Sequence, residues 1–112
     1  MPYFIYKENE MENLNTTVKH TFCDGSTVEC TITMSRVLAL ANKNKELHKL
    51  MGRMISKGSE DIFEMIRFVY GAYLCANLHD EHVFTEEEFM EKCGDDYHGI
   101  GKTMRALLNP KK

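Results

Sequence analysis

The sequence has 112 residues, of which 43% are apolar, and a formal net charge of −3, so it can fold as one domain with a single core. This acidic balance argues against general binding to nucleic acid. The four cysteines form no CxxC pair, and the first residues do not resemble a secretory signal. We therefore expect a cytoplasmic protein with free thiols and no membrane segment.

The N-terminal third predicts an arm followed by a hairpin. Residues 1–15 are mostly polar, apart from a short apolar run at Tyr3–Tyr6, and we expect a flexible arm. Residues 16–33 alternate between apolar and polar around Asp24-Gly25, a pattern typical of a β-hairpin.

The register of this hairpin can be predicted from its alternation. A two-residue loop would place the apolar residues of the two strands on opposite faces. A loop of three or five residues, with Phe22 paired with Val28 and Val18 with Ile32, places them all on one face. A half-buried hairpin needs that second arrangement, so we expect the odd-numbered loop.

From Ser35, a potential helix cap, the apolar spacing becomes helical. Asn42–Lys45 is a weak point, so either two helices or one kinked helix remains possible. Residues 59–77 are apolar on roughly three sides, which predicts a buried central helix capped by Ser59. Gly71 inside this helix indicates close approach by a neighbouring backbone.

Two further helices follow. Thr85–Glu88 forms a capping box, with Phe84 and Phe89 placed as a hydrophobic staple. Asp95 can cap the last helix, which ends near Asn109. We predict a mainly α fold, in which a small helical bundle surrounds the helix at 59–77 and carries a β-hairpin at 16–33. Residues 16–112 would form one domain with four or five helices.

Charge is distributed unevenly along the chain. Residues 35–58 carry six basic residues and one acid, whereas residues 59–98 carry eleven acids and two bases. Most of these side chains are expected on solvated helix faces. Segments of opposite sign can also orient a self-associating protein, so we expect a homo-oligomer.

No pattern indicates catalysis or a cofactor. Cys75, His79 and His82 have a spacing seen in metal sites, but they lack a second ligand pair, and we expect no metal. Cys93 and His98 resemble a nucleophile and base without an orienting third group. We therefore predict that the protein is not an enzyme.

Eight methionines are a high number for this length. Most are expected to fill the core, since methionine adapts to irregular gaps. Met51 and Met54, flanked by Lys49 and Arg53, are the best candidates for an exposed partner-binding surface.

Several short segments in residues 30–112 resemble the tail assembly chaperones of long-tailed phages and prophages of Gram-positive bacteria. The resemblance does not extend to residues 1–15. The segments that carry it are Asn44–Leu47 (NKEL), Lys57-Gly58, Val69–Asn77 (VYGAYLCAN), Thr85–Phe89 (TEEEF) and the final LLNPKK.

The resemblance implies a small helical protein of the host bacterial cytoplasm that is absent from the mature virion. Its partners would be the tape measure protein, which it keeps soluble, and the tail tube protein that polymerises around it. Relatives can form rings or helical oligomers. Two alternatives remain open: a small DNA-binding regulator that uses the basic segment 35–58, and an immunity or antitoxin-type binding module.

Overall fold

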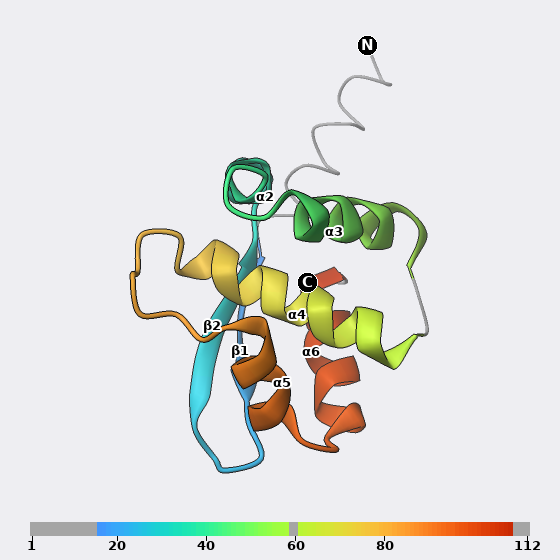
Figure 1. Ribbon diagram of the computed structural model, residues 1–112. Helices are drawn as coiled ribbons and strands as arrows, with labels where there is room; N and C mark the ends of the chain where they lie inside the picture. Colours follow the sequence, from blue (N-terminus) through green and yellow to red (C-terminus); the bar gives the residue numbers. More distant parts are fainter. Residues whose placement is uncertain (1–15, 59–60, 109–112) are drawn as a thin grey trace.

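The computed structural model describes residues 16–58 and 61–108, which form a two-stranded antiparallel hairpin and five helices (Figure 1). The expected arm at 1–15, the Ser59 cap and the helix end at Asn109 lie outside these residues. In chain order the elements are β1 (Thr16–Thr21), β2 (Thr27–Ile32), α2 (Met34–Leu40), α3 (Lys45–Lys57), α4 (Ile62–Ala76), α5 (Glu86–Cys93) and α6 (Tyr97–Leu108).

The hairpin turns through a three-residue loop. The Gly25 N–H donates to the Phe22 carbonyl at 3.0 Å, and the Phe22 N–H donates to the Ser26 carbonyl at 2.8 Å. Gly25 has a φ of 91°, a left-handed conformation that favours glycine. The predicted odd-numbered loop is therefore confirmed.

The register differs from the prediction by two residues. Val18 pairs with Cys30 and His20 with Val28, so the predicted partners, Val28 for Phe22 and Ile32 for Val18, are wrong. The tight loop closes at Ser26, whereas the predicted pairing needed a five-residue loop. The parity is unchanged, so the apolar residues still share the core-facing side, as predicted.

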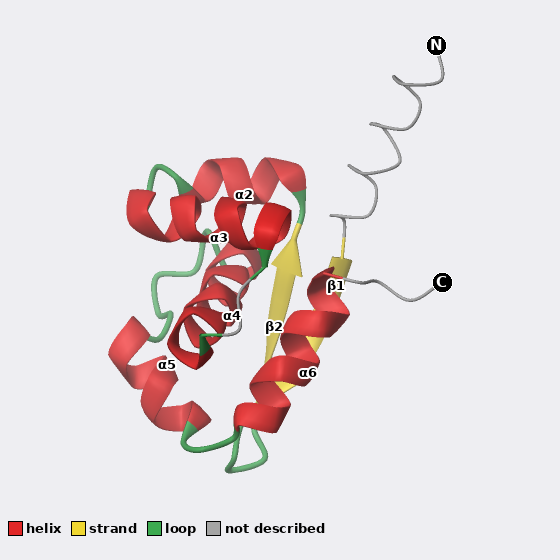
Figure 2. Ribbon diagram, turned by 90° about the vertical axis from the view of Figure 1, so that its right-hand side faces the viewer, coloured by secondary structure: helices red, strands yellow, loops and turns green. Residues whose placement is uncertain are grey.

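Helix α4 lies at the centre of the molecule and packs against β2 and against α2, α3, α5 and α6 (Figures 1 and 2). Its buried residues run without interruption from Phe68 to Cys75. The helix begins after Asp61, whose carboxylate accepts the N–H groups of Phe63 and Glu64. The predicted buried central helix is confirmed over this shorter range.

Two separate helices occupy the basic segment. Thr33, rather than Ser35, caps α2 by accepting the Arg36 N–H. Asn44 caps α3 by accepting the Leu47 N–H at 3.0 Å, so the weak point in the sequence is a helix start. In Figure 1, α2 is viewed end-on while α3 lies across the page, so their axes are far from parallel.

The two C-terminal helices also begin at polar caps. The predicted capping box of α5 is confirmed: Thr85 Oγ1 accepts the Glu88 N–H, and Glu88 Oε1 accepts the Thr85 N–H. At the start of α6, Asp96 accepts the Gly99 N–H at 3.0 Å, so Asp95 is not the residue that caps the helix in this way.

Two tyrosines of α4 fix the segment between α4 and α5. The Tyr70 hydroxyl donates to the Phe84 carbonyl at 2.9 Å, and the Tyr73 hydroxyl accepts the Phe84 N–H at 2.8 Å. Both rings also contact Phe89, so the start of α5 is held against α4 by aromatic packing and hydrogen bonds.

Candidate partner-binding surfaces

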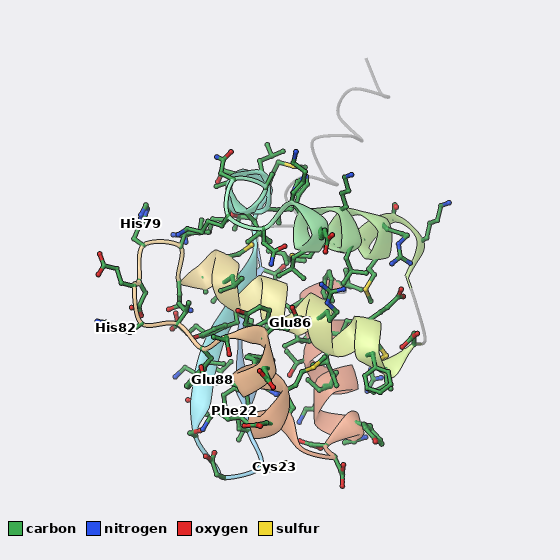
Figure 3. The ribbon with its side chains drawn as sticks, in the orientation of Figure 1. Phe22, Cys23, His79, His82, Glu86 and Glu88 are labelled. Carbon is green, nitrogen blue, oxygen red and sulfur yellow. The ribbon has the colours of Figure 1, made fainter. Side chains whose placement is uncertain are left out.

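The residues with metal-like spacing are not brought together. His79 and His82 project outward from the exposed loop after α4 (Figure 3), whereas Cys75 is buried and its thiol contacts the Arg36 carbonyl. Over residues 16–58 and 61–108, no group of three His, Cys, Asp or Glu side chains is arranged to hold a metal ion.

The Cys93 and His98 pair also lacks the geometry of a catalytic site. Cys93 is buried, and burial raises the pKa of its thiol to about 12, so little thiolate forms near neutral pH. Its carbonyl accepts a hydrogen bond from the Cys23 thiol at 3.0 Å. His98 is exposed on α6. This arrangement offers no activated nucleophile.

The predicted exposure of Met51 and Met54 is wrong. Their exposed fractions are 0% and 1%, because both belong to the stripe of α3 that packs toward α4. The two neighbouring cations face solvent, and Arg53 forms an ion pair of 2.8 Å with Glu64. Of the four proposed partner-binding residues, only Lys49 and Arg53 are therefore available at the surface.

A different apolar surface is exposed on α2. Met34 and Leu38 are 36% and 58% exposed, and they stand one turn apart on the helix. This pair lies at the end of the molecule formed by α2 and α3 (Figures 1 and 2). Leu38 belongs to the helical apolar spacing that begins at Ser35, and this spacing alone does not show whether another element covers the side chain.

The charged helices lie on opposite sides of α4. Lys45, Lys49 and Arg53 are exposed on α3, and three acids are exposed on α5. Both views place α3 at one end of the molecule and α5 toward the other (Figures 1 and 2). The three exposed acids of α5 are Glu87, Glu88 and Glu91. The uneven charge of the sequence is therefore also a separation in space.

A buried histidine was missed by the sequence reasoning. His20 is 1% exposed, and its Nδ1 lies 2.7 Å from the Thr103 hydroxyl of α6. Desolvation lowers the pKa of its imidazole, partly opposed by the charge of Asp96. The position of His20 between Val18 and Phe22 on the apolar face was the signal that could have revealed its burial.

A groove runs beside β1 and α6, with a volume of about 670 Å³. Its walls are β1 together with the start of the hairpin loop on one side, and α6 with the two residues before it on the other. It combines apolar surface from Val18 and Phe22 with charged side chains.

Comparisons of this chain with protein families, with curated proteins and with solved structures found no match. Over the described residues, no helix has both the length and the apolar character needed to cross a membrane.

Proposed function

We propose that this protein is a phage tail assembly chaperone that binds the tape measure protein and keeps it soluble while the tail tube assembles. The proposal rests first on the resemblance over residues 30–112. Two of the segments that carry it, Asn44–Leu47 and Thr85–Phe89, contain the caps of α3 and α5. The host cytoplasm is the compartment that this function implies.

The exposed pair on α2 supports binding of a helical client. Met34 and Leu38 have the one-turn spacing with which apolar anchors contact an amphipathic helix. The exposed cations Lys45 and Lys49 lie on the adjacent helix α3. A client helix with one apolar and one acidic face matches this combination.

The client surface can be tested by co-expression with an amphipathic helical fragment of a tape measure protein. The unchanged protein should keep the fragment in the soluble fraction, and the pair Met34→Glu and Leu38→Glu should send most of it to the pellet. Phe63→Glu is the matched control, because Phe63 is 66% exposed on a different helix.

Thermal unfolding of each variant establishes that the fold is retained before solubility is compared. If the α2 variant folds and holds the fragment as well as the unchanged protein, α2 is not the client surface. If the unchanged protein fails to hold the fragment, the chaperone proposal itself is wrong.

Self-association is part of this proposal. The cations of α3 and the acids of α5 lie on opposite sides of α4, so α3 of one copy can face α5 of the next. A contact of this kind joins two different surfaces and generates a ring or a helical assembly.

A second candidate function is DNA binding by α2 and α3. Only a short turn connects them, their axes are far from parallel, and α3 exposes Lys45 and Lys49. Against it, the third cation of this face, Arg53, is paired with Glu64. Tight, sequence-selective binding to duplex DNA, with no effect on a tape measure fragment, would favour this function.

A further inference from the structure

Among the residues that the structure describes, no strand pairs with the outer edge of β1. The Phe22 N–H donates to the Ser26 carbonyl, so alternate residues of β1 point their backbone groups toward β2. Thr17, Lys19 and Thr21 therefore direct their N–H and C=O groups away from it. Within residues 16–58 and 61–108, no hydrogen bond to these six groups is found.

The groove lies beside this open edge. Helix α6 runs along β1 (Figure 2), and the His20–Thr103 hydrogen bond holds the two elements together on the core side. Lys19 and Thr21 line the groove from the strand, and His98 and Lys102 line it from the helix. An added strand would thus find backbone partners on β1 and a wall of side chains on α6.

The charged side chains are distributed unevenly along the groove. Asp95 and Asp96 lie at the end near the hairpin turn, where Cys23 also lines the wall. Lys19 lies near the middle of β1 and Lys102 near the middle of α6, both farther from the turn. The lining is therefore acidic near the turn and carries two lysines farther along.

We propose that β1 accepts an extended segment of a partner protein as a third, antiparallel strand. Antiparallel pairing is slightly more stable per residue than parallel pairing. It places the N-terminal end of the segment beside Asp95 and its C-terminal end toward Lys102. The partner segment therefore carries a basic residue early, an acidic residue late, and apolar side chains at alternate positions that enter the groove.

This proposal is independent of the chaperone function, whose client is helical. A second copy of the chain fits the groove less well. The core-facing residues of its β1, such as His20 and Phe22, are already buried in their own copy and cannot fill another groove.

The probe is a capped synthetic peptide of alternating valine and threonine, with lysine near its N-terminal end and glutamate near its C-terminal end. Nuclear magnetic resonance titration should give saturable binding with a Kd below about 1 mM. Amide hydrogen exchange should slow at Thr17, Lys19 and Thr21. A peptide with lysine and glutamate interchanged should bind about tenfold more weakly.

Two proline variants separate the edges of the hairpin. Thr21→Pro removes an outward N–H from β1, whereas Thr27→Pro removes one from β2 at the paired position. The first should weaken binding about tenfold and the second should leave it unchanged. If Thr21→Pro does not fold, Lys102→Glu replaces it and should favour the peptide with interchanged charges.

The proposal is overturned if neither peptide saturates the protein, or if binding protects the amides of β2 instead of those of β1. It is also overturned if a folded Thr21→Pro variant binds the peptide like the unchanged protein. Peptide-independent protection of the β1 amides that rises with protein concentration would assign the edge to a second copy.

Discussion

The sulfur of Met51 in α3 occupies the space that a Cβ atom on Gly71 of α4 would need. The Leu47 side chain borders the same space, with its Cγ 3.3 Å from that Cβ position. We predicted that a neighbouring backbone would approach Gly71, but the neighbours are two side chains. Their packing offsets the roughly 1 kcal/mol of helix propensity that a glycine loses against alanine.

Gly71→Ala should therefore destabilise the protein by about 1–3 kcal/mol, because the added methyl group overpacks the α3–α4 contact. Urea unfolding measures the change. Gly52→Ala is the control, since Gly52 lies on the exposed side of α3 and the added Cβ would meet no atom within 4 Å beyond its own stretch of helix backbone. That change should stabilise α3 by up to about 1 kcal/mol. Equal stabilisation by both substitutions would contradict the packing described here.

Stability should fall in mild acid because of His20. Burial lowers the pKa of its imidazole in the folded state below the ordinary 6.5, so folding favours the neutral form. Its contribution is complete above pH 6.5, where the unfolded histidine is also neutral. It decreases as the pH falls from 6.5 toward the lower folded pKa, since the unfolded state then binds the proton first.

Urea unfolding of the unchanged protein and of His20→Gln at pH values from 8 to 5 tests this linkage. The unchanged protein should lose more stability over this range than the variant, which has no imidazole at this position. Parallel pH profiles would show that His20 does not titrate differently on folding.

The thiols should differ strongly in reactivity. Cys23 is exposed, whereas Cys30, Cys75 and Cys93 are buried, and burial raises the pKa of each buried thiol to about 12. A thiol reagent at neutral pH should modify one cysteine in the folded protein and all four in urea. Cys23→Ser should abolish the fast reaction, and its persistence would mean that a buried thiol opens readily.

Self-association should depend on salt and on α3. Sedimentation at low ionic strength should show oligomers that dissociate as salt is added, because exposed charges are screened. Lys49→Glu reverses a charge on the exposed side of α3 and should weaken the oligomers. Lys19→Glu makes the same change on β1 and serves as the control. A monomer at high concentration and low salt would exclude this contact.

Some local features of this protein follow from residue spacing alone. The capping box of Thr85 and Glu88 depends on two residues three positions apart, and α4 is buried because apolar residues occupy most of its circumference. The single apolar face of the hairpin follows from an alternation with a period of two. These features were predictable because each depends on interactions within one element or between neighbouring strands.

The surfaces were decided by contacts between distant segments. Met51 lies two positions from both Lys49 and Arg53 in sequence, but the helical period turns it toward α4 and turns Lys49 to solvent. The hydrogen bond between His20 and Thr103 joins residues 83 positions apart. The groove beside β1 exists because α6 returns to the first strand of the hairpin. Spacing along a chain identifies the face of an element, but only packing determines whether another element covers it.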